Sequence, residues 1–168
     1  MRAQVKSFEA ENPLVVFSGD AFNPSLLSTV TLGAQMPPVL NAIGVHVACV
    51  GNHDLDFGTA QLMKLVKQCK FPWLMANVLD RQTKKPYANA LATHIMDWNG
   101  VKVGFAGLVE EEWLETLGAV NLEELEYVDF IEEGRRLAQK LKAEGAEILV
   151  AITHMRVPND RKVAAELS

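Results

Sequence analysis

Polar side chains that could bind a metal ion follow three apolar runs of the sequence. Asp20 ends the run LVVFSGD, Asn52 follows VHVACVG, and His154 ends ILVAITH. A carboxylate, an amide oxygen and an imidazole together suit a divalent ion such as Mn²⁺, Fe²⁺ or Zn²⁺. The glycines that precede Asp20 and Asn52 let the backbone turn sharply and bring these side chains close to a bound ion. The three residues therefore predict one shared metal site.

A second chemical feature is the pair His53 and Asp54, which follows Asn52 directly. A carboxylate beside an imidazole can fix the tautomer of the ring and raise its basicity. We therefore expect His53 to handle a proton and Asp54 to orient it. His46 and His94 lie inside strand-like runs without a candidate partner, and we interpret them as structural residues. Asp56 is interpreted in the same way, as an acidic residue that precedes a helix.

The elements that must position these residues alternate along the chain. Short apolar runs predict buried strands over residues 14–18, 45–51, 71–78 and 147–154. Helical spacing and glycine stops predict helices over residues 36–44, 58–69 and 127–145. Asn99-Gly100 joins two extended runs within residues 90–109 and predicts a hairpin. This order predicts an α/β fold with a mixed β-sheet flanked by helices, in which functional residues collect beyond the carboxyl ends of the strands.

The bulk composition excludes several classes of partner. With 168 residues and 49% hydrophobic content, we expect a single folded domain over residues 1–168. A net charge of −5 argues against a nucleic-acid or anionic-membrane surface. No stretch approaches the ~20 apolar residues of a membrane span, and the first residues lack the apolar segment of a signal peptide. We therefore expect a cytoplasmic location, with Cys49 and Cys69 as reduced thiols.

The sequence resembles the calcineurin-like metallophosphoesterases, and within them the 5′-nucleotidase branch. The similar segments follow the family's order: FSGDAFNPS, VGNHDLDFG, MANV, NGVKVGFAGLV and ITHMRVPNDRKVAAEL. This resemblance implies an αββα sandwich. It also implies that two divalent ions (Mn, Zn, Fe or Mg) activate a water molecule, which hydrolyses a phosphate ester. It implies a small phosphorylated substrate, with a nucleoside monophosphate as the leading candidate.

The resemblance also implies a role for each site residue. Asp20 would bridge the two metal ions, and Asn52 and His154 would bind the second ion. His53, oriented by Asp54, would stabilise or protonate the leaving oxygen. Arg156, two residues beyond His154, is a candidate phosphate contact because its planar fork matches phosphate oxygens.

Two motifs of the family do not occur in the sequence: Asp-x-His, expected before residue 12, and Gly-His-x-His, expected after residue 168. We therefore expect residues 1–168 to be an incomplete catalytic domain without the C-terminal nucleotidase domain. We expect this incomplete domain to bind one ion weakly or none. Its exposed sheet edges would favour homo-oligomers. One alternative is an inactive, truncated fragment that acts as a binding or oligomerising module. Another is an unrelated α/β domain that holds a nucleotide or phosphate without turnover, although no glycine-rich phosphate loop is present.

Overall fold

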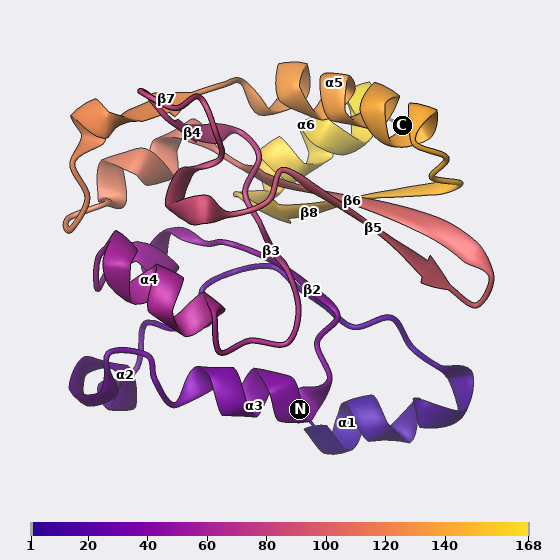
Figure 1. Ribbon diagram of the computed structural model, residues 1–168, viewed down its shortest axis with the longest axis horizontal. Helices are drawn as coiled ribbons and strands as arrows, with labels where there is room; N and C mark the ends of the chain where they lie inside the picture. Colours follow the sequence, from indigo (N-terminus) through magenta and orange to yellow (C-terminus); the bar gives the residue numbers. More distant parts are fainter. Residues whose placement is uncertain (1, 168) are drawn as a thin grey trace.

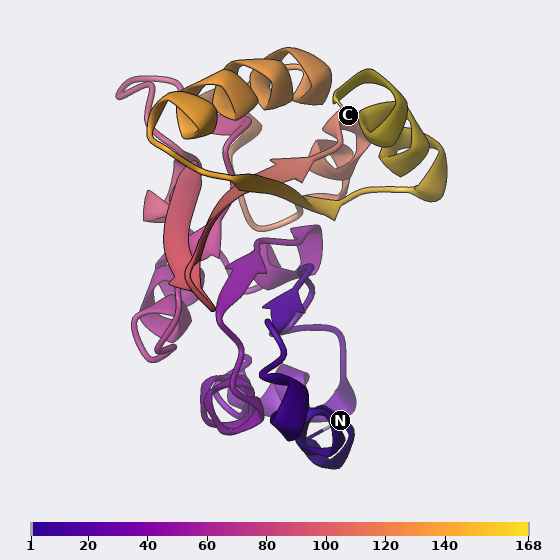
Figure 2. The same ribbon diagram turned by 90° about the vertical axis from the view of Figure 1, so that its right-hand side faces the viewer.

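The computed structural model describes residues 2–167, which form four layers: helices, a sheet, a second sheet and further helices (Figures 1 and 2). The first sheet has the parallel order β1-β2-β3. Its strands are β1 (Val16–Phe17), β2 (Val47–Cys49) and β3 (Trp73–Leu74). Helices α1 (Arg2–Ser7), α2 (Leu26–Thr31) and α3 (Met36–Ile43) lie beyond this sheet, and α4 (Thr59–Val66) packs beside it.

The second sheet has the order β5-β6-β8. Strands β5 (Thr93–Trp98) and β6 (Val101–Val109) form the antiparallel hairpin that Asn99-Gly100 predicts. Strand β8 (Ile148–His154) runs parallel to β6, with His154 opposite Val109. Helices α5 (Phe130–Ala143) and α6 (Val157–Leu167) cover the outer face of this sheet (Figure 2).

The α/β class and the mixed sheet flanked by helices are therefore confirmed, because β6 pairs antiparallel with β5 and parallel with β8. The strands do not all belong to this one sheet. They divide between two sheets, and β4 (Val78–Asp80) and β7 (Leu125–Tyr127) form a separate antiparallel pair. Antiparallel pairing within the three-stranded sheets is confined to β5 and β6. The physical reason is that an apolar run marks a strand but does not specify its partner. The layering agrees with the αββα sandwich that the resemblance implies.

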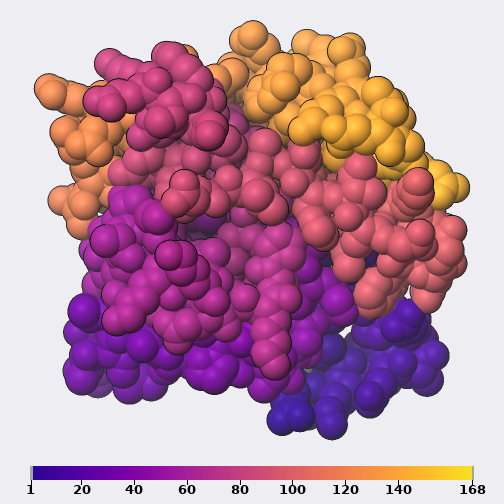
Figure 3. Space-filling view, viewed as in Figure 1, coloured from indigo at the N-terminus to yellow at the C-terminus, as the bar shows by residue number. Residues whose placement is uncertain are grey.

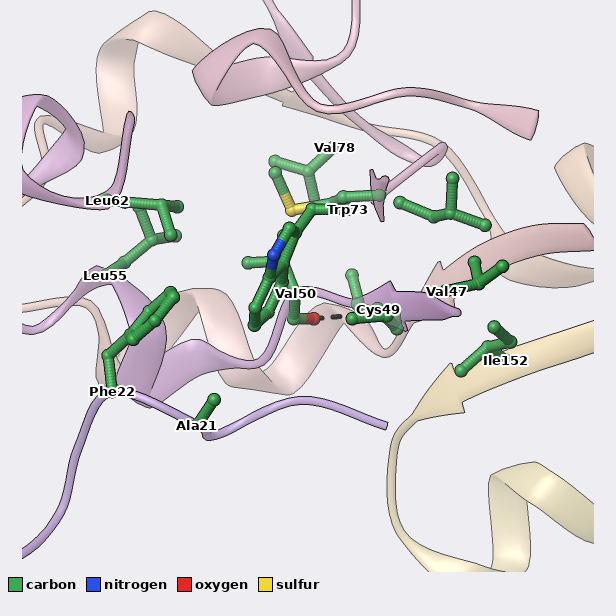
Figure 4. Close-up of a cluster of buried hydrophobic side chains, with 14 of the residues drawn as sticks. Ala21, Phe22, Val47, Cys49, Val50, Leu55, Leu62, Trp73, Val78 and Ile152 are labelled. Carbon is green, nitrogen blue, oxygen red and sulfur yellow. Dashed lines mark hydrogen bonds between the residues drawn. The ribbon is translucent and has the colours of Figure 1, made fainter. Parts of the chain in front are cut away.

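The main core lies between the two sheets (Figure 4). Val47 of the first sheet and Ile152 of the second both belong to it, and Phe22 stacks on Trp73 with ring centroids 5.0 Å apart. A second core lies between the β5-β6-β8 sheet and its helices, where Leu137 of α5 is fully buried. The space-filling view shows bands of colour: the indigo and purple first part of the chain lies at the bottom, the magenta and salmon middle part across the centre, and the orange and yellow last part at the top (Figure 3).

Two helix ends show how local sequence sets these boundaries. Asp129 begins α5, where its carboxylate accepts hydrogen bonds from the N–H groups of Ile131 and Glu132. Gly44 ends α3 with φ +86°, a left-handed conformation that favours glycine. No helix within residues 2–167 has the length and apolar character to span a membrane. Cys49 and Cys69 are free cysteines.

Candidate functional site

The structure brings together the three residues that the sequence assigns to one metal site. Asp20 and Asn52 lie just beyond the carboxyl ends of β1 and β2, and His154 is the last residue of β8, so both sheets contribute to the site. Nε2 of His154 lies 3.4 Å from Oδ2 of Asp20 and 3.1 Å from Oδ1 of Asn52. An ion between these three atoms would therefore have ligands from both sheets.

Glycines allow the backbone to approach this closely. A Cβ atom on Gly51 would lie 2.5 Å from the backbone N of Asp20 and 2.9 Å from Cε1 of His154. One on Gly19 would lie 2.6 Å from Nδ1 of His154, and Gly19 also has φ +100°. Real Cβ atoms are not found at such distances, so neither position could carry a side chain without a shift of the site. The sharp turn expected from the sequence is present at Gly19, whereas Gly51 is extended (φ −103°), so its glycine is required by the close approach and not by a turn.

The hydrogen bonds of His154 determine what the site can hold. Nδ1 lies 2.7 Å from the carbonyl oxygen of Ser18, so Nδ1 must carry a proton and donate it. In the neutral imidazole, Nε2 is then an acceptor, and it faces the oxygens of Asp20 and Asn52, which are also acceptors. Three acceptors that face one another need a shared cation, either a proton on Nε2 or a metal ion.

The pKa values of Asp20 and His154 are coupled through this contact. Burial raises the pKa of Asp20, but the hydrogen bond and charge of His154 and the N–H of His53 more than offset it, so the pKa lies below its ordinary value. The hydrogen bond with Asp20 raises the pKa of His154 against the opposing effect of burial. Both shifts favour a negative Asp20 beside a positive charge.

Asp54 does not orient His53, contrary to the expectation from the sequence. Its carboxylate is 1% exposed and accepts hydrogen bonds from four backbone N–H groups of the two loops. The donors are those of Gly51, Asp20, Ala21 and Phe22, at 2.7–3.0 Å. Burial raises the pKa of Asp54 to about 6, although these donors lower it. Both carboxylate oxygens accept N–H groups. Asp54 therefore joins the loops that carry Asp20 and Asn52.

Asp56 is the residue that orients His53, and the sequence reading assigned it a structural role. Nδ1 of His53 lies 2.8 Å from Oδ2 of Asp56. The same oxygen accepts a hydrogen bond from Nδ2 of Asn23 at 2.5 Å. Residues Asn52–Leu55 form a 3₁₀-helix, in which side chains three residues apart lie on one face. The three-residue spacing of His53 and Asp56 could have identified this pair in the sequence. Adjacent residues such as His53 and Asp54 point to different sides of such a turn.

A cavity of about 460 Å³ adjoins the site and is lined in part by Asn52, His154 and Arg156. Nε of Arg156 lies 2.9 Å from Oε1 of Glu110, and its Nη2 pairs with Glu112. Arg156 therefore lies where a phosphate contact was expected, but its guanidinium is already paired with two carboxylates. A phosphate would have to compete with them.

Glu110 is the buried partner in this ion pair, with 6% of its surface exposed. It accepts hydrogen bonds from the backbone N and Nε of Arg156 and from Nδ2 of Asn159. Burial raises the pKa of Glu110, but these donors outweigh it and hold the pKa below its ordinary value. Glu110 thus fixes the turn between His154 and α6.

The donor set has consequences for a bound ion. Within residues 2–167 there is no group of three or more His, Cys, Asp or Glu side chains that could hold a metal. An ion at Asp20 and His154 would therefore depend on the amide oxygen of Asn52 as its third ligand.

No protein-family model matches the chain. Among curated proteins, it is 27% identical over 159 residues to the NAD 5′-nucleotidase of Haemophilus influenzae, a match that covers 94% of this chain and 26% of that protein. It is 30% identical over 121 residues to the 5′-nucleotidase of Vibrio cholerae, which covers 69% of this chain and 21% of that protein. The chain thus spans about a quarter of the length of these relatives.

Solved structures agree with this relationship. The chain matches the NAD nucleotidase of H. influenzae with a TM-score of 0.83 and 25% identity, over 97% of this chain and 32% of that one. It matches the calcineurin-like phosphoesterase YfkN of Bacillus subtilis with a TM-score of 0.74 and 24% identity, over 91% of this chain and 52% of that one. The chain is therefore related in sequence to the 5′-nucleotidases and has the fold of the calcineurin-like phosphoesterases.

Proposed function

We propose that this chain carries a metal-dependent site for the hydrolysis of phosphate esters. The observation that carries the proposal is the convergence of three acceptors, Oδ2 of Asp20, Oδ1 of Asn52 and Nε2 of His154, with Nδ1 of His154 committed to a backbone carbonyl. A carboxylate, an amide oxygen and an imidazole fit a divalent ion of the Mn²⁺, Fe²⁺ or Zn²⁺ type. The relatives named as nucleotidases support the reaction class.

Asp20, Asn52 and His154 would hold the ion. When bound, such an ion lowers the pKa of a coordinated water and withdraws charge from the phosphoryl group. Ser18 contributes by fixing the ring of His154 so that Nε2 faces the ion. Asp54 contributes by holding the loops of Asp20 and Asn52 in one arrangement.

His53 would act on the leaving oxygen of the substrate. Its side chain is 40% exposed, and its backbone N–H donates to Oδ1 of Asp20 at 2.9 Å, so it lies beside the metal site. Asp56 accepts a hydrogen bond from Nδ1–H of His53, which leaves Nε2 of His53 to hold or deliver a proton to the substrate. This arrangement supports a general acid role for His53, with Asp56 as its positioning residue.

The substrate would be a small phosphorylated compound, with a nucleoside monophosphate as the leading candidate. The adjoining cavity of about 460 Å³ is of the size that holds small ligands. Two curated relatives are named as 5′-nucleotidases of different bacteria. Glu110 and Asp160 line the cavity together with Arg156, so a phosphate there would need the bound cation to offset acidic neighbours.

The proposal is tested by hydrolysis of an aryl phosphate and of AMP by the purified chain. The assay is run with MnCl₂, with a chelator, and with the variant His53→Asn. We expect turnover that needs Mn²⁺ and falls by a factor of about 10² or more in the variant. Turnover that is equal in the presence of chelator would contradict the metal site, and turnover unchanged by His53→Asn would contradict the role of His53.

A further inference from the structure

The amide of Asn52 can serve as a metal ligand in only one of its two orientations. Its Oδ1 can bind a cation, whereas its NH₂ group is a donor and cannot. The two orientations have almost the same shape, so packing alone does not choose between them. A hydrogen-bond partner on the far side of the amide is needed to make the choice.

Thr116 is placed to make this choice. Nδ2 of Asn52 lies 3.0 Å from Oγ1 of Thr116. Oγ1 of Thr116 in turn donates its only hydrogen to the carbonyl oxygen of Trp113 at 2.7 Å. With that hydrogen in use, the hydroxyl can only accept from Asn52, so it selects the NH₂ group. Oδ1 is then directed to the opposite side, where it lies 3.1 Å from Nε2 of His154.

The segment that carries Thr116 is held in place by the core. Thr116 ends the 3₁₀-helix η4 (Glu111–Thr116), which follows β6 of the second sheet. Trp113 in the same helix is 4% exposed and belongs to the main core. The carbonyl group that takes the Thr116 hydrogen is therefore part of an anchored turn. The hydrogen bonds from Trp113 through Thr116 to Asn52 therefore connect the second sheet to a loop of the first sheet.

We propose that Thr116 is a positioning residue for the metal site, because it holds the amide of Asn52 with its oxygen toward Asp20 and His154. This inference rests on the proposed function, since it concerns the ion that Asn52 would bind. It extends the site to a residue outside the five sequence motifs that carry the resemblance to the phosphoesterase family.

The first test is the affinity of the purified chain for Mn²⁺, measured from the electron paramagnetic resonance signal of the free ion. Thr116→Val keeps the shape of the side chain and removes the acceptor, so we expect affinity to fall about tenfold. Thr116→Ser keeps the hydroxyl and serves as the matched control, with affinity unchanged. Thr116→Ala removes the same oxygen without adding bulk and replaces the valine variant if that variant unfolds.

The second test separates orientation from a general loss of structure. Asn52→Asp has an oxygen at both positions, so Thr116 has no orientation to select in that background. We expect Thr116→Val to lower the affinity for Mn²⁺ in the unaltered chain and to leave it unchanged beside Asn52→Asp. An equal loss in both backgrounds, or no loss in either, would overturn the role of Thr116. Failure of the unaltered chain to bind Mn²⁺ would instead overturn the proposed metal site, and this role with it.

Discussion

Asp54 and Asp56 lie two residues apart and have different tasks. Asp54 is buried and accepts only backbone N–H groups, whereas Asp56 contacts the side chains of His53 and Asn23. Adjacency in the sequence suggested that Asp54 orients His53. The 3₁₀ turn reverses this, because it brings residues three apart to one face. Asp54 is therefore a residue of the loop structure, whereas Asp56 contacts His53 and is its proposed positioning residue.

We predict that Asp54→Asn mainly lowers stability, whereas Asp56→Asn mainly lowers activity. Asp54→Asn turns one acceptor oxygen into a donor that faces buried N–H groups, so the free energy of unfolding should fall by about 3 kcal/mol or more. Asp56 is only partly buried, and Asp56→Asn should cost less than about 1 kcal/mol. It should lower hydrolysis on the order of tenfold. Urea unfolding and hydrolysis rates of the two variants check this, and full activity of Asp56→Asn would refute its positioning role.

The strands and helices that carry the site differ in how far the sequence predicts them. Helices α3, α4 and α5 were predicted, because each has apolar residues at helical spacing. A glycine follows the ends of α3 and α5 and marks where they stop. Helix α2 was not predicted, because Leu26, Leu27 and Val30 are exposed and leave no apolar face that packs inward. Strand ends predicted which residues meet. The turns after them, which decide hydrogen-bond partners, depend on contacts between distant segments.

One such contact is the hydrogen bonding of Glu110, at the end of β6, to the start of α6. At neutral pH its carboxylate accepts three hydrogen bonds, two from Arg156 and one from Asn159. These donors hold the pKa of Glu110 below its ordinary value of 4.5, so the folded state favours the ionised form. A lowered acid pKa stabilises the fold above pH 4.5, and this contribution is lost as the pH falls through the lowered pKa.

We therefore predict a pH-dependent difference between the unaltered chain and Glu110→Gln. At pH 7 the variant should lose about 1 to 2 kcal/mol of unfolding free energy, since Glu110 is buried but Arg156 is exposed to solvent. The difference should shrink as the pH falls below 4.5, where Glu110 of the unaltered chain begins to take up a proton. Urea unfolding of both proteins from pH 7 to pH 3 measures it. A difference that stays constant over this range would contradict the account.

The molecule as a whole holds a site that is divided between two sheets. Asp20 and Asn52 follow strands of the first sheet, and His154 ends a strand of the second. The sheets touch at Gly107 of β6, where a Cβ atom would lie 2.6 Å from Cβ of Leu74 in β3. The N–H of Ala76 donates to the carbonyl oxygen of Gly107 at 2.8 Å in the same place. We therefore expect the distance between His154 and the pair Asp20 and Asn52 to depend on this contact.

We predict that Gly107→Ala weakens metal binding although Gly107 is not a ligand. The added methyl group should force the sheets apart, with a loss of about 1–3 kcal/mol in unfolding free energy and a lower affinity for Mn²⁺. Leu137→Ala is the matched control, because Leu137 lies in the second core, away from the contact between the sheets. It should cost about 2–5 kcal/mol and leave the Mn²⁺ affinity of the folded protein unchanged. Equal affinities for Mn²⁺ in both variants would show that the spacing of the sheets does not control the site.

The location of a bound ion tests the central claim most directly. Crystals of the chain grown with MnCl₂ would be measured at the manganese absorption edge, and the anomalous difference map would locate the ion. We predict a peak roughly 2.0–2.3 Å from Oδ2 of Asp20, Oδ1 of Asn52 and Nε2 of His154. Absence of a peak among these atoms at saturating Mn²⁺, with Nε2 of His154 still directed at the two oxygens, would contradict the metal site. Nε2 of His154 would then carry a proton at the position predicted for the metal ion.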